Sequence, residues 1–459
     1  MPTHYLDRIA DFAQSLRITD LPADVLDRAR WLLLDGIAVT VAGSAEPHVR
    51  KLAAMLRQRG SQGRSLFVAG GFRGDAADAA LANATAACVH VLDEGHKYAR
   101  GHVGTYVLPS VLAVAEEREV DGDGLLTAFV AAYEIAARMG IACRVRESMH
   151  PSGTWGTIGA AAAVARLMGF DARRIREAMN VAAPLTLATS WQAATQGATV
   201  RDLYSGQGAA NGVNAPRWVE AGFTGSDDDV AHVFGRVSAE RFDREAAAAD
   251  LGTRWEVLRN YFKVHACCRN FQSGIDAVLK LREQHGIAAG DIVQVRADTF
   301  AIPARDNAER KPVNVLAAKE SFPVSLALTL VNGRCDQSVF TQERVADPEV
   351  ARLAAACEVR CDPELDALAP EKRPSRITLG LRDGRQFTAY EPVAHGDPSW
   401  PLTPGELEHK FEVLVGSRYG RERAETIREA VRRLPNARPV RELTAAVETS
   451  ASNAQETMA

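Results

Sequence analysis

Apolar residues recur every three or four positions through the first half of the chain, which is the spacing of a helix that buries one face. Leu26, Ala29, Leu33, Ile37 and Val41 give this pattern early in the sequence. Similar runs predict helices over residues 47–59, 74–92, 107–119, 122–146, 154–168, 172–186, 205–221 and 242–249. Many of these runs are rich in alanine and poor in aromatic residues, so the helices can approach one another closely.

The pattern changes near residue 265. Residues 291–300 alternate between apolar and polar positions as a strand does. Residues 376–382 and 385–390 also resemble strands, and Asp383-Gly384 between them is a hairpin signal. Residues 353–359 fit a strand edge or a helix.

Helical spacing returns at three further places, which are residues 270–285, 404–415 and 421–434. The tail from residue 445 is polar, and we expect it to be frayed. The elements together predict a mainly α protein. Residues 1–265 and 396–459 form a large all-helical domain, and residues 266–395 form a smaller α+β domain inserted into it.

Composition excludes several classes of protein. The 459 residues are 46% hydrophobic and 24% charged, which is ample for a large core. The net charge of −4 implies no basic face for nucleic acid. The N-terminus lacks the layout of a signal peptide, and the apolar helix over 125–143 is interrupted by Glu134 and Arg138. We expect no helix long enough to span a bilayer, and hence a soluble cytoplasmic protein without a membrane partner.

The seven cysteines are scattered and include no CxxC pair. Cys357 and Cys361 are separated by three residues, and Cys267 and Cys268 are adjacent. Neither spacing gives a zinc or iron–sulfur framework, so we expect reduced thiols and no metal.

The densest group of ionisable side chains lies between residues 93 and 102, after an alanine-rich run that fits a helix. Ten residues hold two carboxylates, two imidazoles and two fixed cations. A charged surface turn is the alternative, but paired histidines beside a tyrosine at a helix end favour a functional site. The candidate residues are Asp93, His96, Lys97, Tyr98, Arg100 and His102.

Residues 149–156 open a helix that is rich in glycine and alanine. A helix start offers free N–H groups and a favourable dipole to an anion, whereas glycines also serve close packing. His150 and Thr154 are the candidates in this segment. Gly206 and Gly208 resemble part of a dinucleotide fingerprint, but no predicted strand precedes them, so we reject a Rossmann site.

Two further segments carry cations. Arg201 has a planar fork that suits a carboxylate, although an isolated arginine is more often part of a surface ion pair. Residues 263–272 bring Lys263, Arg269 and Gln272 together with a Cys-Cys pair where the helical domain gives way to the α+β domain. Ligand sites favour domain boundaries, and an ordinary charged hinge is the alternative.

In this order, the segments resemble those of the MmgE/PrpD family, which includes 2-methylcitrate dehydratases and cis-aconitate decarboxylases. The most specific match is the Lys-…-Cys-Cys-Arg-…-Ile-Asp-Ala signature. The matching motifs are Asp93…His102 with Gly104 and Leu108-Pro109, His150 to Gly159, Gly197 to Gly212, and Lys263 with Cys267-Cys268-Arg269 and Ile275-Asp276-Ala277.

The resemblance implies a helical domain with an inserted lid domain, a homodimer, and a site between the two domains. It also implies cofactor-free chemistry on a small di- or tricarboxylate. Asp93, His102, His150 and Lys263 match the active-site positions of the family.

The chain departs from the family pattern at four places. Glu94-Gly95-His96 stands where dehydratases and decarboxylases usually have Asp-Asp-Thr. Arg201 replaces a usual lysine, and Gln272 replaces a usual histidine. Val324 stands where the decarboxylases carry an active-site tyrosine. These departures weigh most against a decarboxylase.

Removing a proton next to a carboxylate requires a base, cations for the developing charge, and an acid for a leaving hydroxyl. Candidates for proton transfer are His102, His150 and Lys263, with Asp93 orienting a histidine, and candidates for holding carboxylates are Arg100, Arg201 and Arg269. We therefore expect a hydro-lyase similar to 2-methylcitrate dehydratase. The alternative is an epimerase of an amino or imino dicarboxylate, similar to iminodisuccinate epimerase. A non-enzymatic helical scaffold is disfavoured, since it would not need so many convergent His, Lys and Arg residues.

Overall fold

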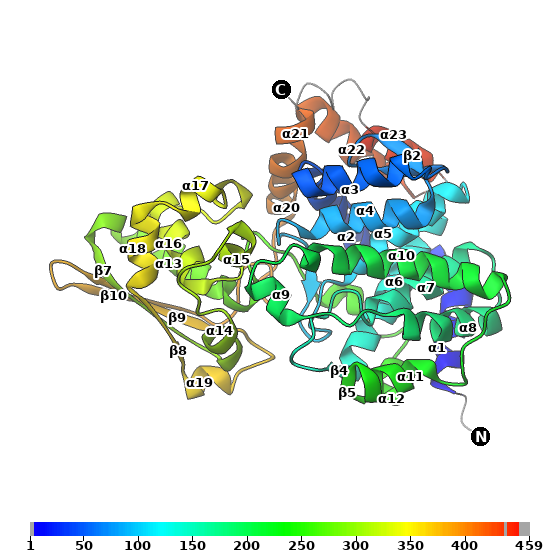
Figure 1. Ribbon diagram of the computed structural model, residues 1–459, viewed down its shortest axis with the longest axis horizontal. Coiled ribbons are helices and arrows are strands. Elements are labelled where there is room, and N and C mark those ends of the chain that lie inside the picture. Colours follow the sequence, from blue (N-terminus) through cyan, green and yellow to red (C-terminus); the bar gives the residue numbers. More distant parts are fainter. Residues whose placement is uncertain (1–3, 436–437, 449–459) are drawn as a thin grey trace.

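The computed structural model describes residues 4–435 and 438–448. Figure 1 shows two parts that lie side by side, a larger bundle of helices and a smaller part in which helices pack on a sheet. Most of the described chain is helical, so the predicted mainly α class is confirmed.

Twelve helices precede the smaller part in the sequence of the described chain. They are α1 (Tyr5–Ser15), α2 (Ala23–Gly43), α3 (Pro47–Gln58), α4 (Ala76–Cys88), α5 (Val103–Glu117), α6 (Gly122–Ala142), α7 (Gly156–Leu167), α8 (Ala172–Ala182), α9 (Trp191–Thr195), α10 (Val200–Glu220), α11 (Asp229–His232) and α12 (Arg244–Ala247). Two predicted starts are several residues late, because α5 begins four residues before the expected 107 and α10 begins five residues before the expected 205. The earlier start places Arg201 in the first turn of this helix.

Small residues let these helices pack closely. Helix α10 packs against α4, α5 and α7, and α6 packs against α5 and α7. A Cβ atom on Gly159 would lie 2.5 Å from the carbonyl oxygen of Ala132, where α7 meets α6. A Cβ atom on Gly212 would lie 2.5 Å from the Cβ of Ala160, where α10 meets α7. The helices therefore cross at distances that only glycine permits at these two positions.

The helical part is not all-helical, which corrects the prediction. It contains three antiparallel pairs of short strands, which are β1 (Ser65–Phe67) with β2 (Phe72–Gly74), β3 (Gly95–His96) with β6 (Asn260–Tyr261), and β4 (Cys143–Val145) with β5 (Ala239–Phe242). Strands of two to four residues are too short to give an alternating pattern in the sequence. The β3–β6 pair matters most, since it brings the segment around residue 95 beside the segment that leads to Lys263.

The smaller part contains a four-stranded sheet in the order β10-β9-β7-β8. Its strands are β7 (Ile292–Thr299), β8 (Cys357–Cys361), β9 (Ser375–Leu381) and β10 (Gln386–Glu391). Strands β7 and β8 are parallel, and the other neighbours are antiparallel. The predicted hairpin is confirmed, with Gly384 at a φ of 87° in the turn between β9 and β10.

Seven helices belong to this part: α13 (Gln272–His285), α14 (Ala301–Asp306), α15 (Val315–Lys319), α16 (Phe322–Asn332), α17 (Gln342–Val345), α18 (Pro348–Ala355) and α19 (Pro363–Asp366). Helix α13 packs on β9 and β10, and α18 packs on β7. The segment 353–359, which fitted either a helix or a strand, contains both, because α18 ends at Ala355 and β8 begins at Cys357.

The chain then returns to the helical part through α20 (Pro404–Phe411), α21 (Ser417–Tyr419), α22 (Arg421–Arg433) and α23 (Val440–Val447). Lys410 on α20 lies 2.6 Å from the Asp35 carboxylate on α2 and fixes this return. The expected frayed tail is wrong for its first residues, because Val447 is buried in the last turn of α23. Residues 449–459 of that tail lie outside the described residues.

Helix α6 ends at Ala142, four residues before the predicted end at 146, and it is the most apolar long helix of the described chain. By length and composition, its 21 residues are enough to cross a bilayer. This corrects the expectation that no helix would be long enough to span one. However, 94% of its apolar window is buried inside the protein, as in a core helix. Glu134 and Arg138 lie fully buried on α6 and form an ion pair with each other.

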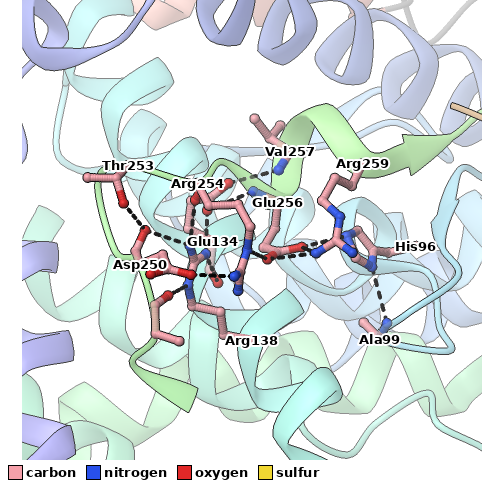
Figure 2. A network of polar contacts seen from close by, with 11 residues as sticks. His96, Ala99, Glu134, Arg138, Asp250, Thr253, Arg254, Glu256, Val257 and Arg259 are labelled. Atoms are coloured by element: carbon pink, nitrogen blue, oxygen red, sulfur yellow. Dashed lines mark hydrogen bonds and ion pairs between the residues drawn. The ribbon is translucent and has the colours of Figure 1, made fainter. Parts of the chain in front are cut away.

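Figure 2 shows how this pair ties α6 to the chain before β6. The Glu134 carboxylate accepts the backbone N–H groups of Glu256 and Val257 at 3.0 and 2.8 Å. Arg138 donates to the carbonyl oxygen of Arg254 at 2.6 Å. The buried pair therefore makes its hydrogen bonds within α6 and to the backbone of residues 249–257 instead of to water.

The network continues from Glu256 toward β3. The buried Glu256 carboxylate lies 2.8 Å from Arg254, 2.8 Å from Arg259 and 3.2 Å from Nε2 of His96. Burial works to raise the pKa of Glu256, but His96 and the two arginines lower it to about 2. Glu256 is therefore charged at neutral pH and links β3 to the segment that enters β6.

We expect Glu134→Ala to lower the free energy of unfolding by about 3–5 kcal/mol, because the Arg138 guanidinium would stay buried without its carboxylate. Denaturant unfolding monitored by circular dichroism measures this loss. Glu425→Ala is the matched control, since the Glu425–Arg428 pair is largely exposed and should contribute less than about 1 kcal/mol. Equal effects of the two substitutions would contradict the role assigned to the buried pair.

Candidate active site

A cavity of about 450 Å³ lies between the helical part and the α+β part. Its volume suits a small-molecule ligand. The helical part contributes residues such as His102, His150 and Lys263, and the α+β part contributes residues such as Arg305 and Arg373. The lining is therefore assembled from segments that are far apart in the sequence.

Half of the residues predicted from the sequence line this cavity. They are Arg100, His102, His150, Arg201, Lys263 and Arg269. Asp93 is buried, and its carboxylate contacts two of these six residues. The structure therefore brings together seven of the twelve candidates, which lie in four separate segments of the sequence.

The centre of the site is the chain of contacts Lys263–Asp93–His102. Nζ of Lys263 lies 3.3 Å from Oδ1 of Asp93 and donates to the carbonyl oxygen of Val91 at 3.0 Å. Oδ2 of Asp93 lies 3.3 Å from Nδ1 of His102 and accepts a hydrogen bond from Thr105 at 3.0 Å. Burial opposes the charge of Asp93, but His102, Lys263 and Arg201 lower its pKa to about 2. Asp93 is therefore a carboxylate at neutral pH.

The surroundings of His102 determine which of its ring nitrogens carries the proton. Nδ1 lies 2.8 Å from the carbonyl oxygen of Glu94, and a carbonyl only accepts, so Nδ1 is the donor. Burial lowers the pKa of His102 to about 4, helped by Lys263 and opposed by Asp93. At neutral pH the ring is neutral, and its lone pair is on Nε2. His102 lines the cavity and is thus suited to accept a proton.

His150 has the opposite arrangement. Its Nδ1 accepts the backbone N–H of Ser152 at 3.2 Å, and its ring stacks on Trp191 with centroids 5.0 Å apart. Burial lowers the pKa of His150 well below the ordinary value, and the charge of Arg201 adds to this effect. A neutral ring with Nδ1 as acceptor carries its proton on Nε2. His150 can therefore offer a hydrogen-bond donor to the cavity that it lines.

Arginines surround these histidines. The buried Arg201 donates to the carbonyl oxygen of Cys88 at 2.9 Å and pairs with Asp202 at 3.3 Å. Burial lowers the pKa of Arg201, but the neighbouring Cys88 and acidic groups including Asp202 outweigh burial and raise it. The guanidinium of Arg269 lies 4.3 Å from the ring centroid of Tyr261. Both arginines thus present fixed positive charge to the cavity.

Sequence reasoning missed other charged residues of the lining. Arg146, Arg305 and Arg373 add to the cations, and Glu320 is a buried carboxylate that lines the same cavity. They lie in ordinary polar stretches, so no local pattern distinguishes them. The full lining has seven cationic side chains and four carboxylates, an excess that favours a polyanionic ligand.

Besides Asp93, which lies behind the lining, five of the predicted candidates lie outside the described lining of the cavity and contact the protein instead. His96 is buried against Glu256, and Oγ1 of Thr154 donates to the carbonyl oxygen of Pro151 at 2.5 Å. Lys97 and Tyr98 reach the α+β part, where both donate to Glu371 at 2.9 and 3.0 Å.

Gln272 is the fifth of these candidates. Its Nε2 donates to the carbonyl oxygens of His265 and Cys267, both at 2.9 Å, and its Oε1 accepts from Arg269 at 3.2 Å. Gln272 thus holds the turn that carries Arg269 rather than reaching the cavity itself.

Glu94 is a further buried group beside the site. Its carboxylate accepts hydrogen bonds from the backbone N–H of Gly104 and from the hydroxyl of Tyr133. Burial raises the pKa of Glu94 to about 8 despite these two hydrogen bonds. The sequence placed this carboxylate next to Asp93, but gave no sign that the two would differ so strongly in pKa.

The raised pKa of Glu94 predicts a pH-dependent stability. The folded protein binds this proton more tightly than the unfolded chain, whose pKa is near 4.5. The contribution of protonated Glu94 to the free energy of unfolding is therefore fully present below pH 4.5 and is lost as the pH rises toward 8. We expect Glu94→Gln to reduce the loss of stability over this interval by roughly 2–4 kcal/mol, as measured by denaturant unfolding at both pH values. An unchanged slope would show that Glu94 does not titrate there.

The lowered pKa of His102 predicts an extended acidic range of activity. A base must be neutral, so function is retained above its pKa and lost as the pH falls through about 4. We expect a ¹³C-labelled histidine signal that disappears in His102→Gln to titrate near this value. In the pH profile of kcat/KM, the decline on the acidic side should lie in the same pH range. A decline near the ordinary histidine pKa of about 6.5 would assign the base to another group.

Comparisons with known proteins identify the family of this chain. The sequence matches the model of the MmgE/PrpD N-terminal domain over residues 7–240 and that of the MmgE/PrpD C-terminal domain over residues 265–436. It is 24% identical to the cis-aconitate decarboxylase of Aspergillus terreus, over 92% of this chain and 91% of that protein. It is also 24% identical to the cis-aconitate decarboxylase of Homo sapiens, over 93% of this chain and 91% of that protein. With both family domains matched across most of its length, the chain belongs to the MmgE/PrpD family.

Proposed function

We propose that this protein is a cofactor-independent enzyme that removes a proton next to a carboxylate of a small polycarboxylate. The observation that carries the proposal is the Lys263–Asp93–His102 chain beside a cavity with a clear excess of cations. Membership of the MmgE/PrpD family and relatives named as decarboxylases support an enzyme, and specifically chemistry of the lyase type.

In the proposed first step, Nε2 of His102 takes the proton from the carbon next to a substrate carboxylate. The electron pair moves into that carboxylate, where Arg201 and the Nε2–H of His150 stabilise the developing charge. Asp93 stabilises the imidazolium that forms on His102, from its position 3.3 Å from Nδ1. The fixed positive charges that lower the pKa of His102 also attract the substrate, so base and binding site depend on one electrostatic field.

The second step determines the reaction type. In a hydro-lyase, the electron pair returns from the carboxylate to form a C=C bond as the bond to a hydroxyl on the adjacent carbon breaks. The leaving oxygen takes a proton from the Lys263 ammonium and departs as water. An ammonium has three N–H donors, and two of those on Lys263 have acceptors in Val91 and Asp93. The third is available for the cavity that Lys263 lines. An epimerase would instead return a proton to the other face of the same carbon.

A hydro-lyase similar to 2-methylcitrate dehydratase remains our first choice, and an epimerase of an amino or imino dicarboxylate is the alternative. A decarboxylase is disfavoured despite the names of the relatives. Val324, at the position of the decarboxylase tyrosine, is buried near the start of α16 and has no polar group. Closure of the α+β part over the substrate as a lid would exclude water and strengthen the contacts to the forming carbanion.

Incubation of the enzyme with a panel of di- and tricarboxylates in D₂O, followed by NMR, tests the proposal. Formation of an alkene with loss of water indicates a hydro-lyase. Deuterium at one carbon with inversion indicates an epimerase, and release of CO₂ indicates a decarboxylase. We expect His102→Gln and Lys263→Ala each to lower the rate by roughly 10²–10⁴-fold.

The control for these variants is Lys280→Ala, which removes a half-exposed lysine that pairs with Glu391 on the surface of the α+β part. It should turn over substrate at the wild-type rate. Absence of deuterium incorporation or elimination for every acid of the panel would refute the proposed function. Full activity of a folded Lys263→Ala enzyme would refute the role of the lysine.

A further inference from the structure

The four carboxylates of the cavity lining differ in their partners. Glu147 lies 3.4 Å from Arg305, and Asp306 lies 2.7 Å from the same arginine. Asp366 accepts the backbone N–H of Ala301 at 2.8 Å. Three of the four acids are therefore committed to contacts within the protein.

Glu320 is the exception. Its side chain lines the cavity at an exposure of only 5%, and its Oε2 is buried without a hydrogen-bond partner in the described part of the chain. The backbone at this position is fixed, because its carbonyl oxygen accepts a hydrogen bond from Asn307 at 2.7 Å and Ser321 caps α16. Glu320 cannot easily turn outward to reach water.

A buried carboxylate oxygen without a donor is costly, and such atoms persist mainly where a ligand completes them. The neighbouring thiol of Cys268 keeps its proton, because burial and the Glu320 carboxylate raise its pKa, but an S–H group is only a weak donor and Oε2 stays without a partner. A further carboxylate from the substrate would be repelled at this point. A substituent with an O–H or N–H group would instead supply the missing donor.

We propose that Glu320 binds a hydrogen-bond-donating substituent, a hydroxyl or an ammonium group, on the polycarboxylate substrate. This inference rests on the proposed function, because it assumes that the cavity binds polycarboxylates. Arginines bind the carboxylates of the substrate, and Glu320 binds the hydroxyl or ammonium substituent between them. A polycarboxylate without such a substituent is therefore a poor ligand.

Three matched acids test this selectivity by isothermal titration calorimetry. Succinate carries no substituent, malate carries a hydroxyl, and aspartate carries an ammonium group. We expect Glu320→Ala to weaken malate or aspartate binding by roughly tenfold or more, which is the effect of losing a hydrogen bond to a charged group. Succinate should bind equally or more tightly, because the repulsion is removed.

Glu320→Gln distinguishes a hydroxyl from an ammonium substituent. It also keeps the shape of the side chain, so it can be used if the alanine variant does not fold. Its amide oxygen still accepts from a hydroxyl, so a site for hydroxy acids keeps most of its affinity for malate. A site for amino acids loses its affinity for aspartate, because the substitution removes the negative charge of Glu320. Glu358→Gln removes a carboxylate on β8 that lies outside the cavity lining and pairs with Arg360, and it should leave the ranking of the three acids unchanged.

The outcomes separate this inference from the proposed function. If all three acids bind the wild-type protein and respond equally to Glu320→Ala, the role of Glu320 is refuted while the polycarboxylate site stands. If none of the acids binds and no acid of the D₂O panel reacts, both are refuted.

Discussion

The buried negative charge of Asp93 is the constraint on which the site depends. A carboxylate that is 1% exposed would be neutral or strongly destabilising unless cations and donors surrounded it. The fold meets this demand with Lys263, which is 170 positions away in the sequence, and with His102, which begins α5. Strands β3 and β6 bring the two segments side by side. The network around Glu256 then fixes the backbone on both sides of that pair.

The same charges control the histidines. His102 and His150 lie among fixed cations in a buried cavity, so both stay neutral at a pH where an exposed histidine would be partly protonated. Backbone contacts then give them opposite tautomers, with the lone pair on Nε2 of His102 and the proton on Nε2 of His150. A cavity that attracts a polyanion thereby also prepares one group to accept a proton and another to donate a hydrogen bond. Binding and proton transfer are two results of one arrangement of charge.

The sequence predicted the parts of this arrangement that local patterns can reveal. Helical periodicity gave most of the helices, alternation with an Asp-Gly turn gave the β9–β10 hairpin, and clustering of His, Lys and Arg gave the segments of the site. The two-residue strands β3 and β6 carry no pattern, although they align the site. The sequence also could not show which residues of the cluster at 93–102 reach the cavity and which contact the protein elsewhere. Lys97 and Tyr98 turn toward Glu371, while Arg100 and His102 turn toward the cavity.

Glu320 and Glu134 illustrate the limit in another way. Glu134 is an acid within the apolar helix α6, and Glu320 lies in the turn between α15 and α16; the role of each depends on whether the fold brings a partner to it. Glu134 meets Arg138 and two backbone N–H groups, whereas Oε2 of Glu320 meets no donor within the described chain. Sequence spacing predicts the first pair, since residues four apart share a helix face. It has no means of predicting that the second acid would be left open toward a cavity.

The two parts of the molecule contribute different kinds of group. The proposed proton-transfer groups are His102 and Lys263 with their partner Asp93. All three belong to the helical part, and they would serve elimination, epimerisation or decarboxylation alike. Glu320 and the arginines at 305 and 373 come from the α+β part. In the proposed mechanism, the helical part removes a proton, and the lining supplied by the α+β part selects the substituents that a substrate can carry. Under this proposal, membership of one family is compatible with a different reaction, since the first depends on the proton-transfer groups and the second on a few residues of the lining.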